Sequence, residues 1–508
     1  MESQGAMRIL LASSEVNPYS KSGGLGDMVG ALAKFLGRAG HQVGVVTPLY
    51  HGIREAFPGL QPFDWKLDFP MGDQRVQGGV CVEEAGGGPT IYFIDQPLFY
   101  DRPELYQERG ADYADNAERF IFLCKSVVNL ARFLPWRPEL IHVHDWQAAP
   151  VAALVEDERR RGVWAAAPPV CLTIHNLAFQ GNFPAAKFGL TNLPPEYFQP
   201  GGMEFYGGMN FLKGGISYAS VITTVSPRYA REITTEQFGC GLDGALRWRQ
   251  DVLIGILNGV DYDEWTTVGN PYLVRSYTAD DLRGKAVNKA EMQAEAGLPV
   301  LGDVPLFGTV ARLAEQKGVD IQLGALEEML AADMQFILLG SGGREFERGY
   351  RKLELRYPSK CAVKIGFDTR LSHRIESACD FFLMPSRFEP CGLNQMYSLR
   401  YGTVPVVRVT GGLDDSVIDA TEDPAHADGI KFREYSVRAL AKAIRKALVL
   451  YGDKELLEHY RRNGMSQDFS WERTAVTYEK VYQQALQTRQ AQVASSLHSS
   501  ERPMKEES

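Results

Sequence analysis

KSGGLGD, residues 21–27, joins a short apolar run at residues 7–12 to an amphipathic segment at residues 28–36. This order predicts a first strand, a glycine turn and a first helix. The adjacent glycines let the backbone approach a ligand without an intervening Cβ. The helix start directs unpaired N–H groups and a partial positive charge to the same place, where the lysine adds a full charge. The stretch predicts a site for a phosphorylated ligand; tight packing of the helix on the strand is the alternative.

The glycine turn follows neither of the two common nucleotide-binding patterns. A dinucleotide-binding fold requires G-x-G-x-x-G, and a P-loop requires G-x-x-x-x-G-K-[ST]. A nicotinamide dehydrogenase is the generic alternative for such a fold, and the missing G-x-G-x-x-G pattern counts against it.

Length, composition and charge restrict the class of protein. The chain has 508 residues, of which 44% are hydrophobic and 23% charged, and its net charge is −9. The length suggests about two to three domains. The negative charge provides no general attraction for nucleic acid or for an anionic membrane, so an anionic ligand must be bound by local cations.

Cysteine usage and hydropathy favour a cytoplasmic protein. The seven cysteines are scattered and form no C-x-x-C pair, which argues against structural zinc and against a disulfide framework. No apolar run approaches the ~20 residues of a membrane span. The first strand begins by residue 7, which leaves no room for a signal or transit peptide.

Eleven apolar runs predict the strands of parallel sheets. Most are continuous rather than alternating, which is typical of strands buried on both faces, and segments with a helical repeat lie between them. The runs are residues 7–12, 42–47, 90–95, 140–144, 169–174, 221–225, 305–311, 335–340, 362–367, 381–385 and 404–409. Repeated strand–helix alternation predicts a doubly wound α/β architecture.

This strand count is too high for one sheet, and the pattern restarts at residue 305. We expect two Rossmann-like domains, residues 1–255 and 256–475. Residues 476–508 then hold the end of a long helix and a disordered polar tail from residue 490. Ligands of such sheets bind at the carboxyl ends of the strands, so two facing domains would share one deep cleft.

Two segments of the second domain place polar side chains after strands. Residues 308–318 carry Arg312 and Lys317, which could bind a diphosphate as a fork and a point charge; two solvated loop cations are the alternative. Residues 385–395 place Glu389 at a strand end, ahead of amides that open a helix. Glu389 would hydrogen-bond a ligand or, in the alternative, cap that helix.

The first domain places histidines at the same edge. His144-Asp145 is interpreted as a ligand-facing histidine followed by a helix cap, and His175-Asn176 ends the next strand. We expect His142 and His144 to face opposite sides of their strand, so that they do not bind one metal jointly. This edge is suited to hydroxyl groups.

Taken together in order, these motifs resemble those of the bacterial glycogen synthases and plant starch synthases, which are retaining glucosyltransferases of the GT-B fold. The resemblance covers residues 7–480 and includes KSGGLGD, HVHDWQAA, TIHNLAFQG, EFYGGMNFLKGG, LNGVDYDEW, ARLAEQKGVD and SRFEPCGLNQMYSLRYGTVPVVRVTGGLDD. It implies transfer of glucose from ADP-glucose to the 4-hydroxyl of a glycogen or α-1,4-glucan acceptor, without a cofactor or metal and without nucleic acid or membrane partners.

The resemblance also implies roles for individual residues. Lys21 would contact the distal phosphate and sugar of the donor, Arg312 and Lys317 the diphosphate, and His144 and Glu389 the glucose hydroxyls. Phe367 would stack on the adenine, where some relatives carry tyrosine. The other implied donor-binding residues are Gly23, Gly24, Asp27, Asn258, Cys391, Gly392, Leu393 and Asn394. Tyr100 and Asn176 are expected near the acceptor.

The chain departs from a wider group of glycosyltransferases, which carries a second glutamate eight positions after the first. Tyr397 stands there instead, as in the glycogen and starch synthase branch. We expect front-face attack, in which the leaving phosphate helps to deprotonate the acceptor hydroxyl. Two alternatives remain: a transferase of the same fold that uses UDP-glucose or another acceptor, and a catalytically silent glucan-binding protein.

Overall fold

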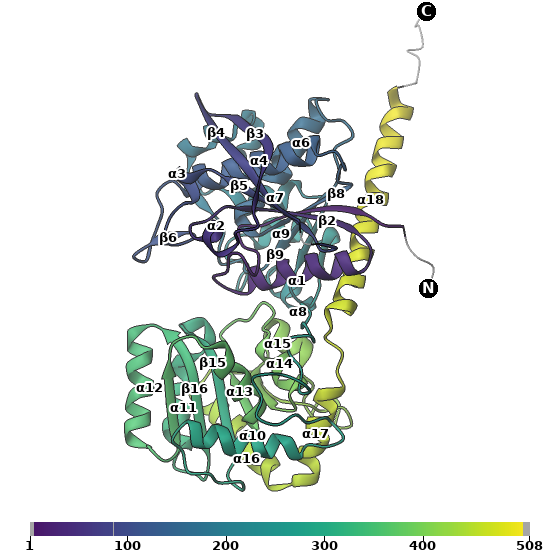
Figure 1. The fold of residues 1–508 in the computed structure, drawn as a ribbon. Helices are drawn as coiled ribbons and strands as arrows, with labels where there is room; N and C mark the ends of the chain where they lie inside the picture. Colours follow the sequence, from purple (N-terminus) through teal and green to yellow (C-terminus); the bar gives the residue numbers. More distant parts are fainter. Residues whose placement is uncertain (1–4, 85, 501–508) are drawn as a thin grey trace, which may run out of the picture. The chain divides into compact units, whose positions relative to one another are not determined.

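The computed structural model describes residues 5–84 and 86–500. The chain forms two compact units. Unit 1 contains the described residues up to Val225, then Ala230–Ile256 and the residues from Thr474 onward. Unit 2 contains Ser226–Tyr229 and Leu257–Arg473. Each unit is built on its own sheet (Figure 1).

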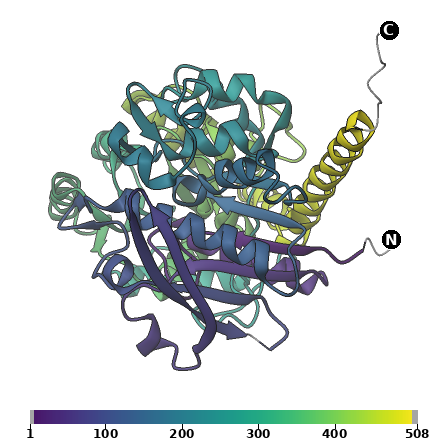
Figure 2. The ribbon, with the colours of Figure 1, turned by 90° about the horizontal axis from the view of Figure 1, so that it is seen from above.

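Unit 1 holds a nine-stranded sheet in the order β14-β13-β9-β8-β1-β2-β5-β4-β3. The strands from β14 to β5 are parallel, and β4 and β3 add an antiparallel edge. β3 and β4 are long strands drawn in purple (Figure 2). The strands are β1 (Arg8–Ala12), β2 (Gln42–Pro48), β3 (Gln61–Met71), β4 (Gln74–Glu84), β5 (Thr90–Asp95), β8 (Leu140–His144), β9 (Val170–Ile174), β13 (Val221–Thr224) and β14 (Leu253–Gly255).

Helices join these strands, and short strand pairs form in the loops. The helices are α1 (Gly24–Arg38), α2 (Ile53–Ala56), α3 (Pro97–Tyr100), α4 (Asn116–Phe133), α5 (Asp145–Ala148), α6 (Val151–Arg160), α7 (Phe211–Tyr218), α8 (Pro227–Glu232) and α9 (Asp243–Trp248). The short strands are β6 (Gln107–Glu108), β7 (Ala111–Asp112), β10 (Asn182–Pro184), β11 (Glu204–Phe205) and β12 (Gly208–Asn210).

Helix α18 (Trp471–Ser500) is longer than the sequence predicts. The expected disorder is wrong for residues 490–500, which continue the helix; residues 501–508 lie outside the described residues. The helix packs on unit 1, where Tyr482 donates to or accepts from His142 and Arg489 donates to the carbonyl oxygen of Ala165. These contacts anchor the helix well beyond its first turns.

Unit 2 holds a six-stranded parallel sheet in the order β17-β16-β15-β18-β19-β20. Its strands are β15 (Leu306–Leu313), β16 (Gln335–Gly342), β17 (Cys361–Ile365), β18 (Phe381–Met384), β19 (Val404–Arg408) and β20 (Ile430–Phe432). Its helices are α10 (Arg283–Glu295), α11 (Val319–Met329), α12 (Arg344–Arg356), α13 (Thr369–Ala378), α14 (Asn394–Arg400), α15 (Gly411–Ser416), α16 (Val437–Gly452) and α17 (Lys454–Ser466).

Two apolar cores cover the two faces of the unit 2 sheet. Successive residues of β16 alternate between them: Phe336 and Leu338 join the core formed with α11, α12 and α16, whereas Ile337 and Leu339 join the core formed with α10 and α13. This two-sided burial explains the continuous apolar runs of the sequence.

The predicted fold class is confirmed, since each unit carries a wholly or mainly parallel sheet with interleaved helices. All eleven predicted strands are present. The antiparallel strands β3 and β4 were not predicted, because their residues are mostly exposed or half-buried. Among the described helices, none has the length and apolarity needed to cross a membrane.

Candidate active site

The glycine turn of unit 1 leads directly into α1, which begins earlier than predicted and has Gly23 as its N-cap residue. A Cβ on Gly23 or Gly24 would meet nothing within 4 Å, whereas a Cβ on Gly26 or Gly30 would come within 2.8 or 2.5 Å of a backbone oxygen. Packing therefore requires glycine at the latter two positions only. The open backbone at Gly23 and Gly24 favours ligand binding over the packing alternative.

Lys21 is held beside this turn by an ion pair. Its Nζ lies 2.7 Å from Oδ2 of Asp27, and both side chains are partly exposed. Exposed ion pairs contribute little to stability, so a phosphate group could compete with Asp27 for the ammonium.

Glu15 organises the same turn and was missed by the sequence analysis. Its buried carboxylate accepts hydrogen bonds from the backbone N–H and the hydroxyl of Ser22, both at 2.6 Å, and from the Tyr106 hydroxyl at 2.7 Å. Glu15 could have been predicted as a site residue from its position just beyond the carboxyl end of β1. Glu15 ties the start of the glycine turn to the sheet.

The expectation that His142 and His144 face opposite sides is wrong. Their ring centroids are 4.1 Å apart, because residues two apart on a strand point to the same face. His142 is fully hydrogen-bonded, to Thr173 at 2.6 Å and Tyr482 at 2.7 Å. Within residues 5–84 and 86–500, no group of three or more His, Cys, Asp or Glu side chains is arranged to hold a metal ion.

His144 retains one unused nitrogen. Its Nδ1 lies 3.1 Å from Nε2 of His175, and its own Nε2 is buried and has no hydrogen-bond partner among the described residues. Burial, together with the neighbouring histidines, holds the pKa of His144 well below its usual value, so the ring is neutral. A neutral imidazole nitrogen can exchange a hydrogen bond with a sugar hydroxyl.

Asp145 does not cap the following helix, contrary to expectation. Its carboxylate accepts a hydrogen bond from the backbone N–H of His175 at 2.7 Å, which joins the ends of β8 and β9. Its φ of 54° is left-handed, a conformation that costs energy for a residue with a Cβ and is concentrated at functional sites. Burial raises the pKa of Asp145 to about 7.

The buried histidines predict acid sensitivity of unit 1. Burial lowers the pKa of His142 to about 3, whereas the unfolded chain takes up that proton near pH 6.5. Stability is thus lost as the pH falls below 6.5, by about 2 kcal/mol for this group at pH 5.0. The raised pKa of Asp145 makes the folded state more stable as the pH falls, but this is one group, whereas three histidines have the opposite effect.

We expect His142→Gln to lose less thermal stability than wild type between pH 7.5 and pH 5.0. Calorimetry at both pH values checks this, with His426→Gln, an exposed histidine, as the control. Equal pH dependence in wild type and His142→Gln would contradict the assignment.

Of the two predicted acceptor residues, Tyr100 requires correction. Its side chain is fully buried, and its hydroxyl donates to the carbonyl oxygen of Arg119 at 2.7 Å. Tyr100 therefore supports the adjacent loop and offers no surface to an acceptor. Asn176 is half-buried at the end of β9, where its side chain accepts from the N–H of Ala178 at 3.1 Å.

Unit 2 brings Lys317 and Glu389 together from positions 72 residues apart. Lys317 donates to Oε2 of Glu389 at 2.6 Å, and Ser386 donates to the same oxygen at 3.0 Å. Glu389 is only 5% exposed. No described residue donates to its Oε1, so that oxygen can accept a further hydrogen bond. The helix-capping alternative is wrong, since α14 has no side-chain cap.

Arg312 and Asn258 carry polar groups without protein partners. Arg312 is the penultimate residue of β15, is exposed, and forms no ion pair with any residue in the described part of the chain. Asn258 is buried, and its Oδ1 accepts no hydrogen bond there. Buried polar atoms are normally paired, so this Oδ1 is open to a donor from a ligand or from water.

The segment from Cys391 to Asn394 leads into α14 and is held in place by contacts with neighbouring backbone. Gly392 is left-handed, with φ 72°, and Asn394 donates to the carbonyl oxygen of Val310 at 2.7 Å. A Cβ on Gly411 would lie 1.9 Å from the backbone carbonyl oxygen of Glu389, and a Cβ on Gly412 would lie 2.1 Å from that of Cys391. These two glycines, which the sequence analysis did not single out, allow this close approach.

Two aromatic residues of unit 2, Phe367 and Tyr397, lie in different surroundings. Phe367 follows Gly366, whose φ is positive, and its ring is 85% exposed, so its face is open to a ligand. Tyr397 instead stacks on Trp265, with ring centroids 3.5 Å apart and an interplanar angle of 5°. The residue that replaces the second glutamate thus belongs to an aromatic stack.

Comparisons with known proteins cover nearly the whole chain. The family of the starch synthase catalytic domain matches residues 8–248, and glycosyl transferases group 1 matches residues 294–467. The chain is 46% identical to a glycogen synthase of Anaeromyxobacter dehalogenans (strain 2CP-1 / ATCC BAA-258) over 94% of this chain and 98% of the relative. It is 42% identical to a glycogen synthase of Koribacter versatilis (strain Ellin345), over 95% and 99%.

Solved structures agree. The catalytic domain of starch synthase IV from Arabidopsis thaliana, bound to ADP and acarbose, is similar with a TM-score of 0.85 and 32% identity, over 95% of this chain and all of that one. A sucrose-phosphate synthase from Thermosynechococcus elongatus has a TM-score of 0.60 at 18% identity, which indicates a shared fold.

Proposed function

Because this chain belongs to the family of the bacterial glycogen synthases and plant starch synthases, we propose that it transfers glucose from ADP-glucose to the non-reducing 4-hydroxyl of an α-1,4-glucan, with retention of configuration. We assign donor binding to residues 256–475 and the acceptor side to residues 1–255. The activity is that of an ADP-glucose:α-1,4-glucan 4-α-glucosyltransferase.

The observation that carries this proposal is the pair of Lys317 and Glu389 at the carboxyl edge of the unit 2 sheet. Both contacts to Glu389 use Oε2, so Oε1 can accept from glucose hydroxyls near the anomeric carbon. The Lys317 ammonium, which has two further N–H groups, can reach a phosphate oxygen at the same time. Arg312 on the same strand end adds a fork for the diphosphate.

The proposed chemistry depends on charge stabilisation. As the glucosyl–phosphate bond breaks, positive charge develops on the sugar and negative charge on the departing ADP. Arg312, Lys317 and Lys21 stabilise the leaving group, and each well-placed donor contributes about 3 kcal/mol. The amides of Gly392, Leu393 and Asn394 add further donors.

Retention follows from attack on the face from which ADP departs. The departing phosphate accepts the proton of the acceptor hydroxyl as the new C1–O bond forms. Glu389, engaged by Lys317, holds the sugar rather than forming a bond to C1. A covalent glucosyl–Glu389 adduct, trapped with a slow substrate and found by mass spectrometry, would overturn this route.

Unit 1 carries its own candidates for donor binding in this proposal. Lys21 exchanges Asp27 for the distal phosphate, and the open backbone at Gly23 and Gly24 allows the phosphate to approach. The free Nε2 of His144 receives a glucose hydroxyl. Asn176 remains the candidate for acceptor contact.

Phe367 provides the stacking surface for the adenine of the donor in this proposal. We expect Phe367→Ala to raise KM for ADP-glucose about tenfold with little change in kcat, because the variant loses the stacking surface for adenine. Phe367→Tyr keeps the ring and should behave as wild type. Steady-state kinetics with ADP-glucose and UDP-glucose test both variants. An unchanged KM in Phe367→Ala would contradict the stacking assignment, and a preference for UDP-glucose would favour the alternative donor.

A further inference from the structure

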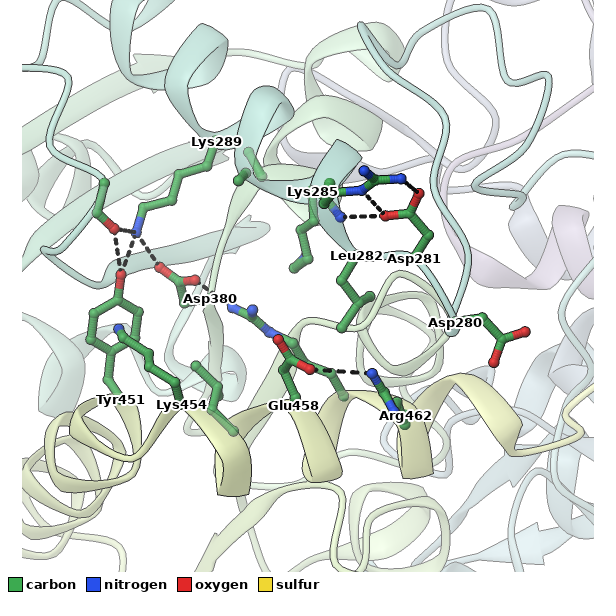
Figure 3. Close-up of a pocket in the computed structure, with 16 residues that line it drawn as sticks. Asp280, Asp281, Leu282, Lys285, Lys289, Asp380, Tyr451, Lys454, Glu458 and Arg462 are labelled. Carbon is green, nitrogen blue, oxygen red and sulfur yellow. Dashed lines mark hydrogen bonds and ion pairs between the residues drawn. The ribbon is translucent and has the colours of Figure 1, made fainter.

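A charged cavity of about 580 Å³ lies in unit 2, away from the residues discussed above (Figure 3). Its walls come from α10 and the segment before it, from the chain just before β15 and β18, and from the region where α16 gives way to α17. Its cationic lining residues are Arg283, Lys285, Lys289, Lys454, Arg461 and Arg462.

This cavity is at the opposite edge of the sheet from the proposed donor site. Gly302 and Asp380, which line it, precede β15 and β18, whereas Arg312 and Glu389 lie at or beyond the carboxyl ends of these strands. The strands are parallel, and the eight residues of β15 span roughly 25 Å. A ligand of one site cannot reach the other.

In two ion pairs of the cavity lining, the charge of the arginine is neutralised by a neighbouring carboxylate. Arg283 lies 2.6 Å from Asp281 and Arg462 lies 3.2 Å from Glu458; the labelled Glu458 and Arg462 are joined on one side of the cavity in Figure 3. These pairs are exposed and contribute little net charge.

The interior, by contrast, has more cations than carboxylates. Asp380 accepts from Lys289 at 2.7 Å and from Arg461 at 2.5 Å, so one carboxylate serves two cations. The Nε of Arg461 is buried and has no partner among the residues described. Lys289 is otherwise satisfied by the Tyr451 hydroxyl at 2.9 Å and by backbone oxygens.

Two further lysines have no carboxylate in contact. Lys285 donates to two carbonyl oxygens and, at 2.6 Å, to the Thr403 hydroxyl; burial lowers its pKa to about 7. The ammonium of Lys454 lies over the Tyr451 ring, 3.3 Å from its centroid, and forms no ion pair with a described residue. With Asp280 included, six basic side chains face four carboxylates around one cavity, and Lys285 is only partly charged near pH 7.

We propose that this cavity binds a small phosphorylated molecule, whose phosphate group is held by Lys454 and Arg461. A guanidinium nitrogen and a mobile ammonium are the usual ligands of phosphate oxygens. The volume falls within the range of small-molecule sites, and the positive excess stands out in a chain of net charge −9. A bound phosphate would connect α17 to α10 through Arg461, Asp380 and Lys289.

Calorimetric titration with inorganic phosphate, against chloride of matched ionic strength, tests the site. The proposal expects Lys454→Gln to weaken binding about tenfold. Lys442→Gln, an exposed lysine of α16 outside the cavity, should bind as wild type. Arg312→Ala, which alters the proposed donor site, should retain the binding that Lys454→Gln loses. These variants separate failure of this site from failure of the proposed function.

Hydrogen exchange gives an independent readout. Phosphate should slow exchange in α17 in wild type and in Arg312→Ala, and not in Lys454→Gln. Binding that is lost in Arg312→Ala and unaffected by Lys454→Gln would overturn the proposal, as would the absence of saturable binding to wild type.

Discussion

Replacing Arg312 with alanine is expected to lower kcat for glucosyl transfer by about 10²–10³-fold. Arg312 is exposed and forms no ion pair among the described residues, so the substitution should cost little stability. Its effect should fall on the transition state, where charge accumulates on the departing diphosphate, and kcat and kcat/KM should therefore fall together. Steady-state kinetics with ADP-glucose and a soluble glucan, together with a melting curve, measure both quantities.

Arg312→Lys is the matched control. Lysine keeps the charge and loses the two-point geometry, so this variant should recover part of the lost rate. Full kcat in Arg312→Ala would contradict the assignment, and a comparable loss caused by unfolding would be evident in the melting curve.

Replacing Glu389 with glutamine is expected to reduce kcat by at least about 10²-fold. Glutamine preserves the volume of a side chain that is 5% exposed, but it removes the negative charge near the sugar on which positive charge develops. It also removes the ionic partner of Lys317. Rates of ADP release and glucan elongation should fall in parallel.

The control for this variant is Glu315→Gln, an exposed acid two residues before Lys317, which should leave kcat unchanged. Wild-type activity in Glu389→Gln would contradict the assigned role. If glucan elongation stops while ADP release continues at the wild-type rate, then Glu389 excludes water rather than promoting bond cleavage.

Local patterns predicted most of the fold. The β15 and β16 runs were found because two apolar cores bury both faces of their sheet, which leaves a continuous apolar signature. The β3–β4 edge has only one covered face and little burial, so its residues gave no such signature. Residues 490–500 look polar and unstructured in sequence, but they continue a helix that is anchored by earlier contacts such as that of Tyr482.

The sequence predicted which residues form the candidate site, but it did not predict which of them are in contact. Lys317 and Glu389 each follow a strand, but their pairing depends on the order of strands in the sheet. The same limit explains Tyr100, which ends α3 and is buried, with its hydroxyl donating to the carbonyl oxygen of Arg119. The supporting roles of Glu15, Gly411 and Gly412 depend on atoms that approach from distant segments.

The most direct test of the central claim follows the fate of glucose from ADP-glucose labelled at C1, incubated with the enzyme and a maltooligosaccharide. Carbon NMR of the product identifies the new linkage and its configuration, and chromatography measures the ADP released. We expect one new α-1,4-linked residue at the non-reducing end for each ADP formed. Release of ADP with free glucose only, a β-configured product, or no turnover of ADP-glucose would contradict it.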